Sequence, residues 1–146
     1  MRESVELANE CIRLAQQDYD LTLLSNASMN PKPLERICNL CQQVVERMLK
    51  SLIYIRGQEP PKTHDLDYLM GIVEFLNPEM EFSSDVRYAA GLLSQYSVRV
   101  RYPFEIEIDE NDELSALDYT KAICKDINIK LESLKNKDLS LLVIAD

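Results

Sequence analysis

Two short segments of the sequence carry side chains that could do chemistry. The first, QEPPKTHDL (58–66), holds His64, the only histidine of the chain. The second, YSVRVRYP (96–103), places two arginines between two tyrosines. Histidine can move a proton near neutral pH, whereas an arginine stays protonated and binds phosphate through paired N–H donors. The first segment is therefore a candidate for proton transfer or ligand contact, and the second for holding a phosphate beside a stacked base.

Three interpretations of His64 stay open, and the structural one is favoured. Gly57 indicates the end of a helix, and the paired prolines that follow prevent its continuation. Thr63 is a good N-cap and Asp65 suits the first turn, so a new helix would begin at Thr63 or His64, with the ring packed or hydrogen-bonded against the preceding turn. Contact with a ligand is the second interpretation, and catalysis is the third.

The arginines have two interpretations of similar weight. Arg99 and Arg101 could pair with the acidic stretch that follows them, which would give a surface network of modest energy. Alternatively, they could join Tyr96 and Tyr102 in binding a phosphate and a stacked base. Positions 99 and 101 do not face the same way on a regular helix, so one arginine would point into the bundle or a dimer cleft and the other outward.

Lys50 is a weaker candidate for ligand binding. It lies four residues after Glu46 in a predicted helix, and residues with this spacing are neighbours on one helix face. A simple ion pair between the two side chains is the favoured interpretation, and contact with a ligand is the alternative.

Cys38 and Cys41 form a CxxC motif that could suggest a metal or redox site. A structural zinc site needs four ligands, and no second cysteine pair or histidine stands at a suitable spacing. Residues three apart share one face of a helix. Packing in the core is therefore the favoured interpretation, and we predict no metal and no cofactor.

Composition limits the class of protein further. The chain has 146 residues, which suits one domain spanning 1–146, and it carries a formal net charge of −9. This charge argues against indiscriminate binding of nucleic acid through phosphates. Apolar residues make up 46% but form no run long enough to cross a bilayer, and the N-terminus lacks the apolar centre of a signal peptide. We expect a cytoplasmic protein without membrane attachment.

The hydrophobic periodicity predicts an all-α fold. Apolar side chains recur at helical spacing in five segments separated by proline, glycine and polar turns. The pattern is typical of an up-and-down four-helix bundle with a fifth helix, and its core spans about 5–135. The segment 104–108 would be extended or a loop, and the apolar tail 138–146 could dock on the bundle or on a neighbouring subunit. The first three predicted helices cover about 4–25, 34–56 and 63–77. The fourth begins after the capping cluster 83–85 and ends by 102, and the fifth covers about 112–136.

Two stretches of the sequence also share a family pattern. Residues 41–70 combine a long helix carrying Gln, Glu and Lys with a glycine-containing turn and a Thr-His-Asp-Leu helix start. Residues 96–103 place a Tyr, and then Arg-Tyr-Pro, at the end of the fourth predicted helix. In this order and spacing, the chain resembles the HEPN family of small helical-bundle proteins.

The resemblance implies a bundle of four to five helices that usually dimerises. HEPN proteins are often encoded beside a minimal nucleotidyltransferase and have been proposed to bind nucleotides, and many are ribonucleases with an Arg-x4-6-His motif near the end of the fourth helix. This sequence departs from that motif, because no histidine follows Arg99 or Arg101. Metal-independent RNA cleavage needs a group that can move a proton near pH 7, so the departure favours binding without turnover.

We therefore expect a non-catalytic HEPN-type protein that binds a nucleotide, a partner minimal nucleotidyltransferase or both, as in a toxin–antitoxin-like pair. The resemblance also implies a homodimer, with Arg101 as the arginine that points inward. Two alternatives stay open. One is a metal-independent ribonuclease whose atypical site joins Arg101, Tyr102 and His64 across a dimer, and the other is a structural adaptor. The predicted ligand-binding side chains are Arg101, Arg99, Tyr96, Tyr102, His64 and Lys50.

Overall fold

Five helices make up the fold, and the all-α prediction is confirmed. The computed structural model describes residues 2–101 and 107–144, with the backbone alone at positions 2 and 98–101. No strand occurs in these ranges. The helices are α1 (Arg2–Ser28), α2 (Leu34–Tyr54), α3 (Leu66–Leu76), α4 (Ser84–Arg101) and α5 (Glu110–Ser133).

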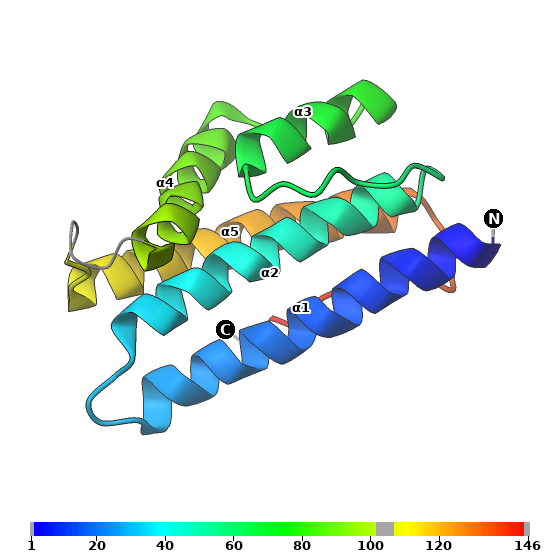
Figure 1. The fold of residues 1–146 in the computed structure, drawn as a ribbon. Coiled ribbons are helices and arrows are strands. Elements are labelled where there is room, and N and C mark those ends of the chain that lie inside the picture. The colour runs from blue at the N-terminus through cyan, green and yellow to red at the C-terminus, as the bar shows by residue number, and fades with distance from the viewer. Residues whose placement is uncertain (1, 102–106, 145–146) are drawn as a thin grey trace.

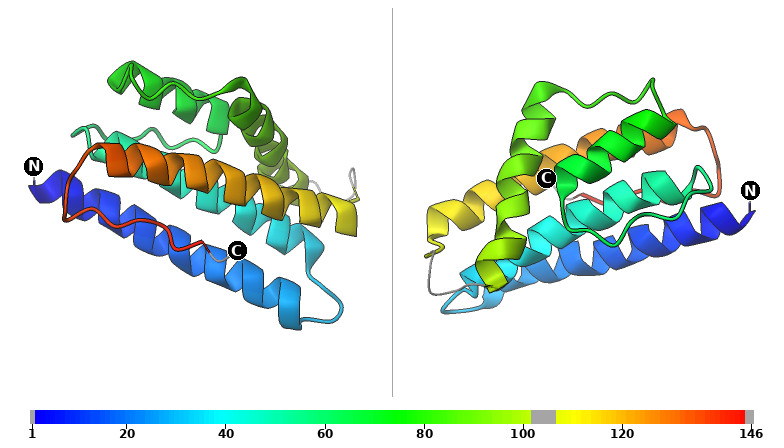
Figure 2. Two further views of the ribbon diagram at one scale, coloured as in Figure 1. Left: turned by 180° about the vertical axis from the view of Figure 1, so that it is seen from behind. Right: turned by 45° about the horizontal axis from the view of Figure 1, so that its top comes forward.

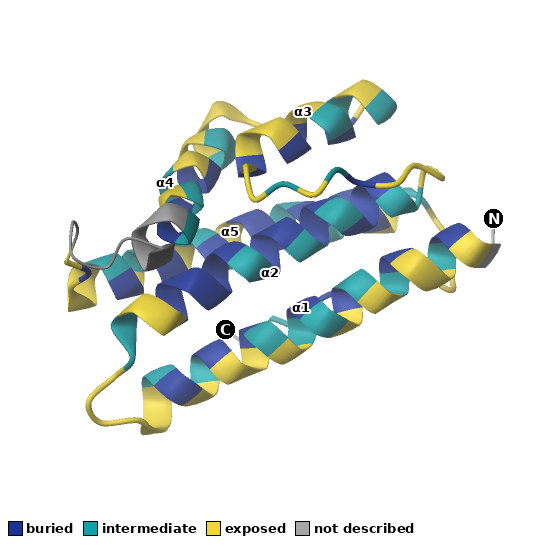
Figure 3. Cartoon of the chain, viewed as in Figure 1, coloured by how far each residue is buried: buried dark blue, intermediate teal, exposed yellow. Residues whose placement is uncertain are grey.

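α2 is the central helix of the bundle. It packs against all four other helices, with α1 and α5 alongside it and α3 and α4 on another side (Figure 1). α4 runs steeply across the long helices instead of along them (Figure 2). Buried residues occupy most positions of α2, whereas α1 keeps one broad exposed face (Figure 3). A helix surrounded in this way needs apolar residues on nearly all sides, which the sequence of α2 supplies.

The favoured interpretation of the CxxC motif is confirmed. Cys38 and Cys41 are both fully buried in the core and form no disulfide, and the same holds for the buried Cys124 on α5. Burial raises the pKa of the Cys41 thiol to about 12, and a hydrogen bond with Thr120 only partly offsets this effect. These thiols therefore pack as small apolar groups.

The starts of α3 and α5 differ from the prediction, and α1 and α4 also begin about two residues earlier than predicted. The N-cap of α3 is Asp65, whose side chain accepts a hydrogen bond from the Tyr68 N–H at 3.1 Å. Thr63 instead accepts from the N–H of Asp65, so the predicted start at Thr63 or His64 was wrong and His64 lies before the helix. α5 begins two residues earlier than predicted, because Asp109 forms a capping box with Asp112.

The C-terminal tail docks on the bundle, which was one of the two predicted alternatives. Residues 138–144 run back between α1 and α5 (Figure 2). Leu142 is buried in the core there, and the described part of the tail contains no helix or strand. Across the described residues, no helix is long and apolar enough to span a membrane. The loop predicted for 104–108 falls mostly outside the described residues.

Candidate functional site

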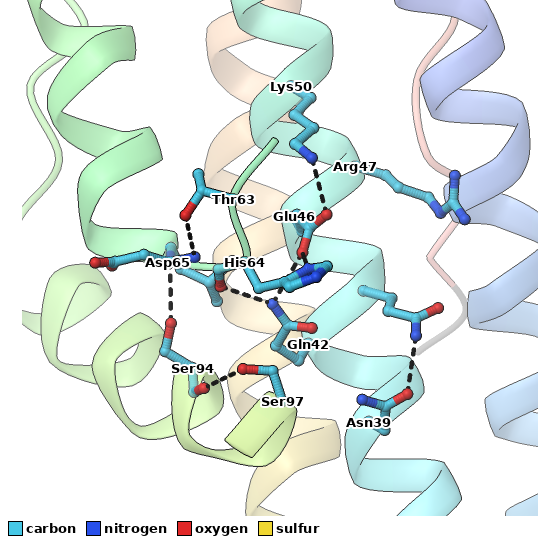
Figure 4. Close-up of polar contacts among 12 residues, drawn as sticks. Asn39, Gln42, Glu46, Arg47, Lys50, Thr63, His64, Asp65, Ser94 and Ser97 are labelled. Atoms are coloured by element: carbon cyan, nitrogen blue, oxygen red, sulfur yellow. Dashed lines mark hydrogen bonds and ion pairs between the residues drawn. The ribbon is translucent and has the colours of Figure 1, made fainter. Parts of the chain in front are cut away.

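Glu46 is the centre of a polar cluster on α2. Its two carboxylate oxygens accept from two side chains on either side, at 2.8 Å from His64 Nδ1 and 3.0 Å from Lys50 Nζ (Figure 4). Gln42 Nε2 also donates to the carboxylate, at 3.2 Å. The Glu46 side chain is only 11% exposed. An ionised carboxylate with four lone-pair sites can accept all three bonds, so the cluster satisfies a nearly buried charge.

The same cluster fixes the connection between α2 and α3. Gln42 Nε2 also donates to the backbone carbonyl of His64 at 3.0 Å, and the N–H of Leu66 donates to Ser94 Oγ on α4 at 3.0 Å. His64 is thereby held through both its ring and its backbone. The sequence-based interpretation expected the His64 ring to pack or hydrogen-bond against the preceding turn. The ring instead hydrogen-bonds to Glu46 on α2.

These contacts set the charge of Glu46 and the orientation of His64. Burial alone would raise the pKa of Glu46, but hydrogen bonds from His64, Lys50 and Gln42 hold that pKa below its usual range. The carboxylate is therefore ionised at neutral pH, and His64 Nδ1 must be the donor toward it. His64 Nε2 has no partner among the described residues, and the imidazole side chain is 56% exposed. A carboxylate that anchors one ring nitrogen and leaves the other free fixes the tautomer of a histidine.

A cleft of about 470 Å³ lies beside this cluster, between α1 and α2. Arg47 reaches it from α2 and pairs with Asp18 of α1 through Nε alone, at 3.0 Å, so its terminal N–H groups have no partner within the described chain. The α1 wall is mainly apolar but carries Glu10, and the α2 wall carries cationic side chains beside the carboxylate of Glu46. The lining residues are Leu7, Glu10, Cys11, Leu14, Gln43, Glu46, Arg47, Lys50, Tyr54 and His64.

Comparison with protein families decides the affiliation of the chain. The family model of the HEPN domain matches residues 3–130, nearly the whole sequence. The chain belongs to the HEPN family. A crystal structure of TT1696 from Thermus thermophilus shares its fold, with a TM-score of 0.58 and 24% identity over 88% of this chain and 96% of that chain. Comparison with curated proteins gives no match.

The structure brings together two of the six ligand-binding residues predicted for this HEPN domain. His64 and Lys50 share the carboxylate of Glu46, and the predicted ion pair between Lys50 and Glu46 is confirmed. Tyr96 lies elsewhere, 5% exposed in the core, with its hydroxyl donating to the carbonyl of Asp112 at 3.4 Å.

The other three predicted residues lie at the end of α4. Arg99 and Arg101 are on its last turns, where only the backbone is described, and Tyr102 lies outside the described residues. Their part in ligand binding stays a prediction.

Two residues of the candidate site were missed from the sequence, one in the polar cluster and one in the cleft. Gln42 was not singled out, and Arg47 was not considered as a ligand-binding residue. The available signal was the spacing 42, 46 and 50, which places three polar side chains on one face of an otherwise buried helix. Arg47 gave no such signal, because its place in the cleft depends on how α1 packs against α2.

Proposed function

We propose that this HEPN protein binds a nucleotide through its phosphates in the cleft between α1 and α2, without turnover. The observation that carries the proposal is the convergence of Arg47, Lys50 and His64 on one cleft of a chain whose net charge is −9. Guanidinium and ammonium groups bind phosphate strongly when they are partly shielded from water. Leu7, Leu14 and other apolar residues of the opposite wall offer a surface for the base.

The existing partners of the cationic side chains decide how each of them can contact a phosphate. Lys50 is already paired with Glu46, so a phosphate must share it, while the terminal N–H groups of Arg47 are unengaged within the described chain. His64 Nε2 can donate to a phosphate only when the ring is protonated, because Nδ1 holds the other proton toward Glu46.

Isothermal titration calorimetry with ATP, GTP and AMP tests the proposal. Arg47→Gln and Lys50→Gln should each weaken binding by about tenfold, since a hydrogen bond from a charged group contributes about 1.5–3 kcal/mol. Arg36→Gln is the matched control, because it removes the same charge from an exposed position on α2 away from the cleft. Absence of binding to the unchanged protein at millimolar nucleotide would refute the proposal, as would an equal loss in all three variants.

We also propose a homodimer and a partner minimal nucleotidyltransferase, as in a toxin–antitoxin-like pair. HEPN membership supports both, and Arg99 and Arg101 on the last turns of α4 would then offer a second phosphate contact. Affinity purification of the tagged chain from its native cells, followed by mass spectrometry, tests the partner. Recovery of a nucleotidyltransferase would support the pairing, and its absence from repeated purifications would contradict it.

A specific observation favours ribonuclease activity as the second candidate. His64 is anchored by a carboxylate at Nδ1 and exposed at Nε2, which is the arrangement of an oriented general base. Incubation of the purified protein with total RNA separates the two candidates. If the protein cleaves RNA and both His64→Ala and Arg101→Ala abolish the cleavage, the function is that of a ribonuclease. If the RNA stays intact, nucleotide binding without turnover remains the proposed function.

A further inference from the structure

The C-terminal strap, residues 138–144, is held by three side-chain amides that pair with its backbone. Asn128 on α5 bonds both the N–H and the carbonyl of Leu142, at 3.0 and 2.9 Å. Gln16 on α1 does the same for Val143, at 2.7 and 3.1 Å. Asn9 accepts from the N–H of Ser140 and donates to the carbonyl of Asp138, at 2.8 and 2.7 Å. Each amide thus takes the part of a neighbouring peptide group in a β-ladder.

These amides bind a strand-like segment mainly by its backbone. All six hydrogen bonds end on main-chain atoms, and only Leu142 is fully buried, whereas Val143 is 72% exposed. In this mode main-chain hydrogen bonds give affinity and a few pockets give specificity. The groove is therefore a binding site for a segment with Leu142 as its buried anchor and with Leu139 and Ile144 packed partly against the core, and the strap is its occupant in this structure.

The strap also fills a gap between two helices. No Cα atom of α1 comes within 8 Å of one in α5 in the described chain, although both helices pack on α2. The strap lies between them and bonds to both, to α1 through Asn9 and Gln16 and to α5 through Asn128 (Figure 2). The groove consequently belongs to the helices and does not depend on the strap coming from the same chain.

The turn that returns the strap to its own chain is strained. α5 ends at Ser133, and Lys135 then adopts a φ of 52°, which is the left-handed region. It is the only residue other than glycine with a positive φ in the described ranges, and a side chain with a Cβ adopts this conformation at a cost in free energy. Opening the turn relieves that cost.

We propose that the groove between α1 and α5 also accepts the strap of a second copy, so that two chains dimerise by reciprocal exchange of residues 138–144. The exchanged segment is identical, so each copy keeps its six backbone hydrogen bonds and the buried Leu142. Only the turn at 134–137 changes conformation. Short strained connections favour this kind of exchange.

The turn offers a matched pair of full-length variants for a test. Lys135→Pro cannot adopt a positive φ and also loses the N–H that donates to the carbonyl of Glu132 at 3.0 Å, so it opposes the closed turn. Lys135→Gly adopts that φ without strain and favours the closed turn. Size-exclusion chromatography coupled to light scattering should show that the association constant for dimer formation is at least about tenfold higher for Lys135→Pro than for Lys135→Gly.

Removal of the amides shows whether any dimer uses the groove. Adding Gln16→Ala and Asn128→Ala to Lys135→Pro should return the protein to a monomer, with circular dichroism verifying that the helices persist. A dimer through another face would be equally populated in all these variants. Exchange is refuted if Lys135→Pro stays monomeric, or if its dimer survives loss of the two amides.

Discussion

Glu46→Gln is the sharpest test of the polar cluster on α2. Glutamine keeps the shape of the side chain but removes the charge that Lys50 and His64 share. Hydrogen bonds to charged groups contribute about 1.5–3 kcal/mol each, against about 1 kcal/mol for neutral ones. The His64 side chain is half exposed, so its hydrogen bond to Glu46 contributes less than a buried one. We expect Glu46→Gln to lower the free energy of unfolding by about 2 kcal/mol at pH 7.

Acid should remove this difference between the two proteins. The pKa of Glu46 is lowered in the folded state, so its contribution is present above the ordinary glutamate pKa and is lost as the pH falls through the folded value. Urea unfolding followed by circular dichroism should show a midpoint about 1 M lower for Glu46→Gln at pH 7. At pH 3 the two midpoints should approach each other.

Glu79→Gln is the control for this experiment, because Glu79 is 62% exposed and pairs with Arg56 at the surface. Its midpoint should stay close to that of the unchanged protein at both pH values. Equal stability of Glu46→Gln and the unchanged protein at pH 7 would show that the charge of Glu46 does not stabilise the fold. An equal deficit at pH 3 would show that the charge is not the cause of the deficit.

Three further predictions concern other parts of the fold. Glu113 is fully buried, and neither of its carboxylate oxygens has a hydrogen-bond partner among the described residues. Burial raises the pKa of Glu113 despite the opposing charge of Lys32, so Glu113→Gln should gain stability over the unchanged protein as the pH rises from 4 to 8 in parallel urea titrations. Asp65→Ala should lower the free energy of unfolding by about 1 kcal/mol in the same assay, because it removes the N-cap of α3, and an equal or larger loss in Thr63→Ala would contradict this. Of the four thiols only Cys11, which is half-buried, should react with a thiol reagent in the folded protein, whereas all four should react in urea.

The helices could be predicted because their signals are local. The period of apolar residues and the glycine and proline at each end predicted α2 from Leu34 to within two residues of its end at Tyr54. The start of α3 was missed because Thr63 and Asp65 are both good N-caps, and the choice depends on contacts made elsewhere. Gln42 holds the carbonyl of His64 to α2, which keeps that residue out of the helix.

The position of the tail and the burial of Tyr96 could not be predicted for a different reason. Tyr96 was considered as a ligand contact because it stands near two arginines, but its ring lies in the core and its hydroxyl reaches the backbone at the start of α5. The tail is held by Asn9, Gln16 and Asn128, which are distant in sequence and ordinary for exposed helix positions. Both outcomes depend on tertiary packing, which periodicity does not encode.

The polar stripe on α2 also indicates that stability alone does not account for this face. α2 is packed by four other helices, and burying a charge there is rarely more stabilising than burying an apolar side chain of similar size. Gln42, Glu46 and Lys50 together hold one histidine with a single nitrogen toward solvent, beside a cleft that Arg47 also lines. A leucine at position 46 would pack the helix but leave His64 without its anchor. Local departures of this kind from apolar packing are expected at functional sites, and they support the cleft between α1 and α2 as the site proposed for a ligand.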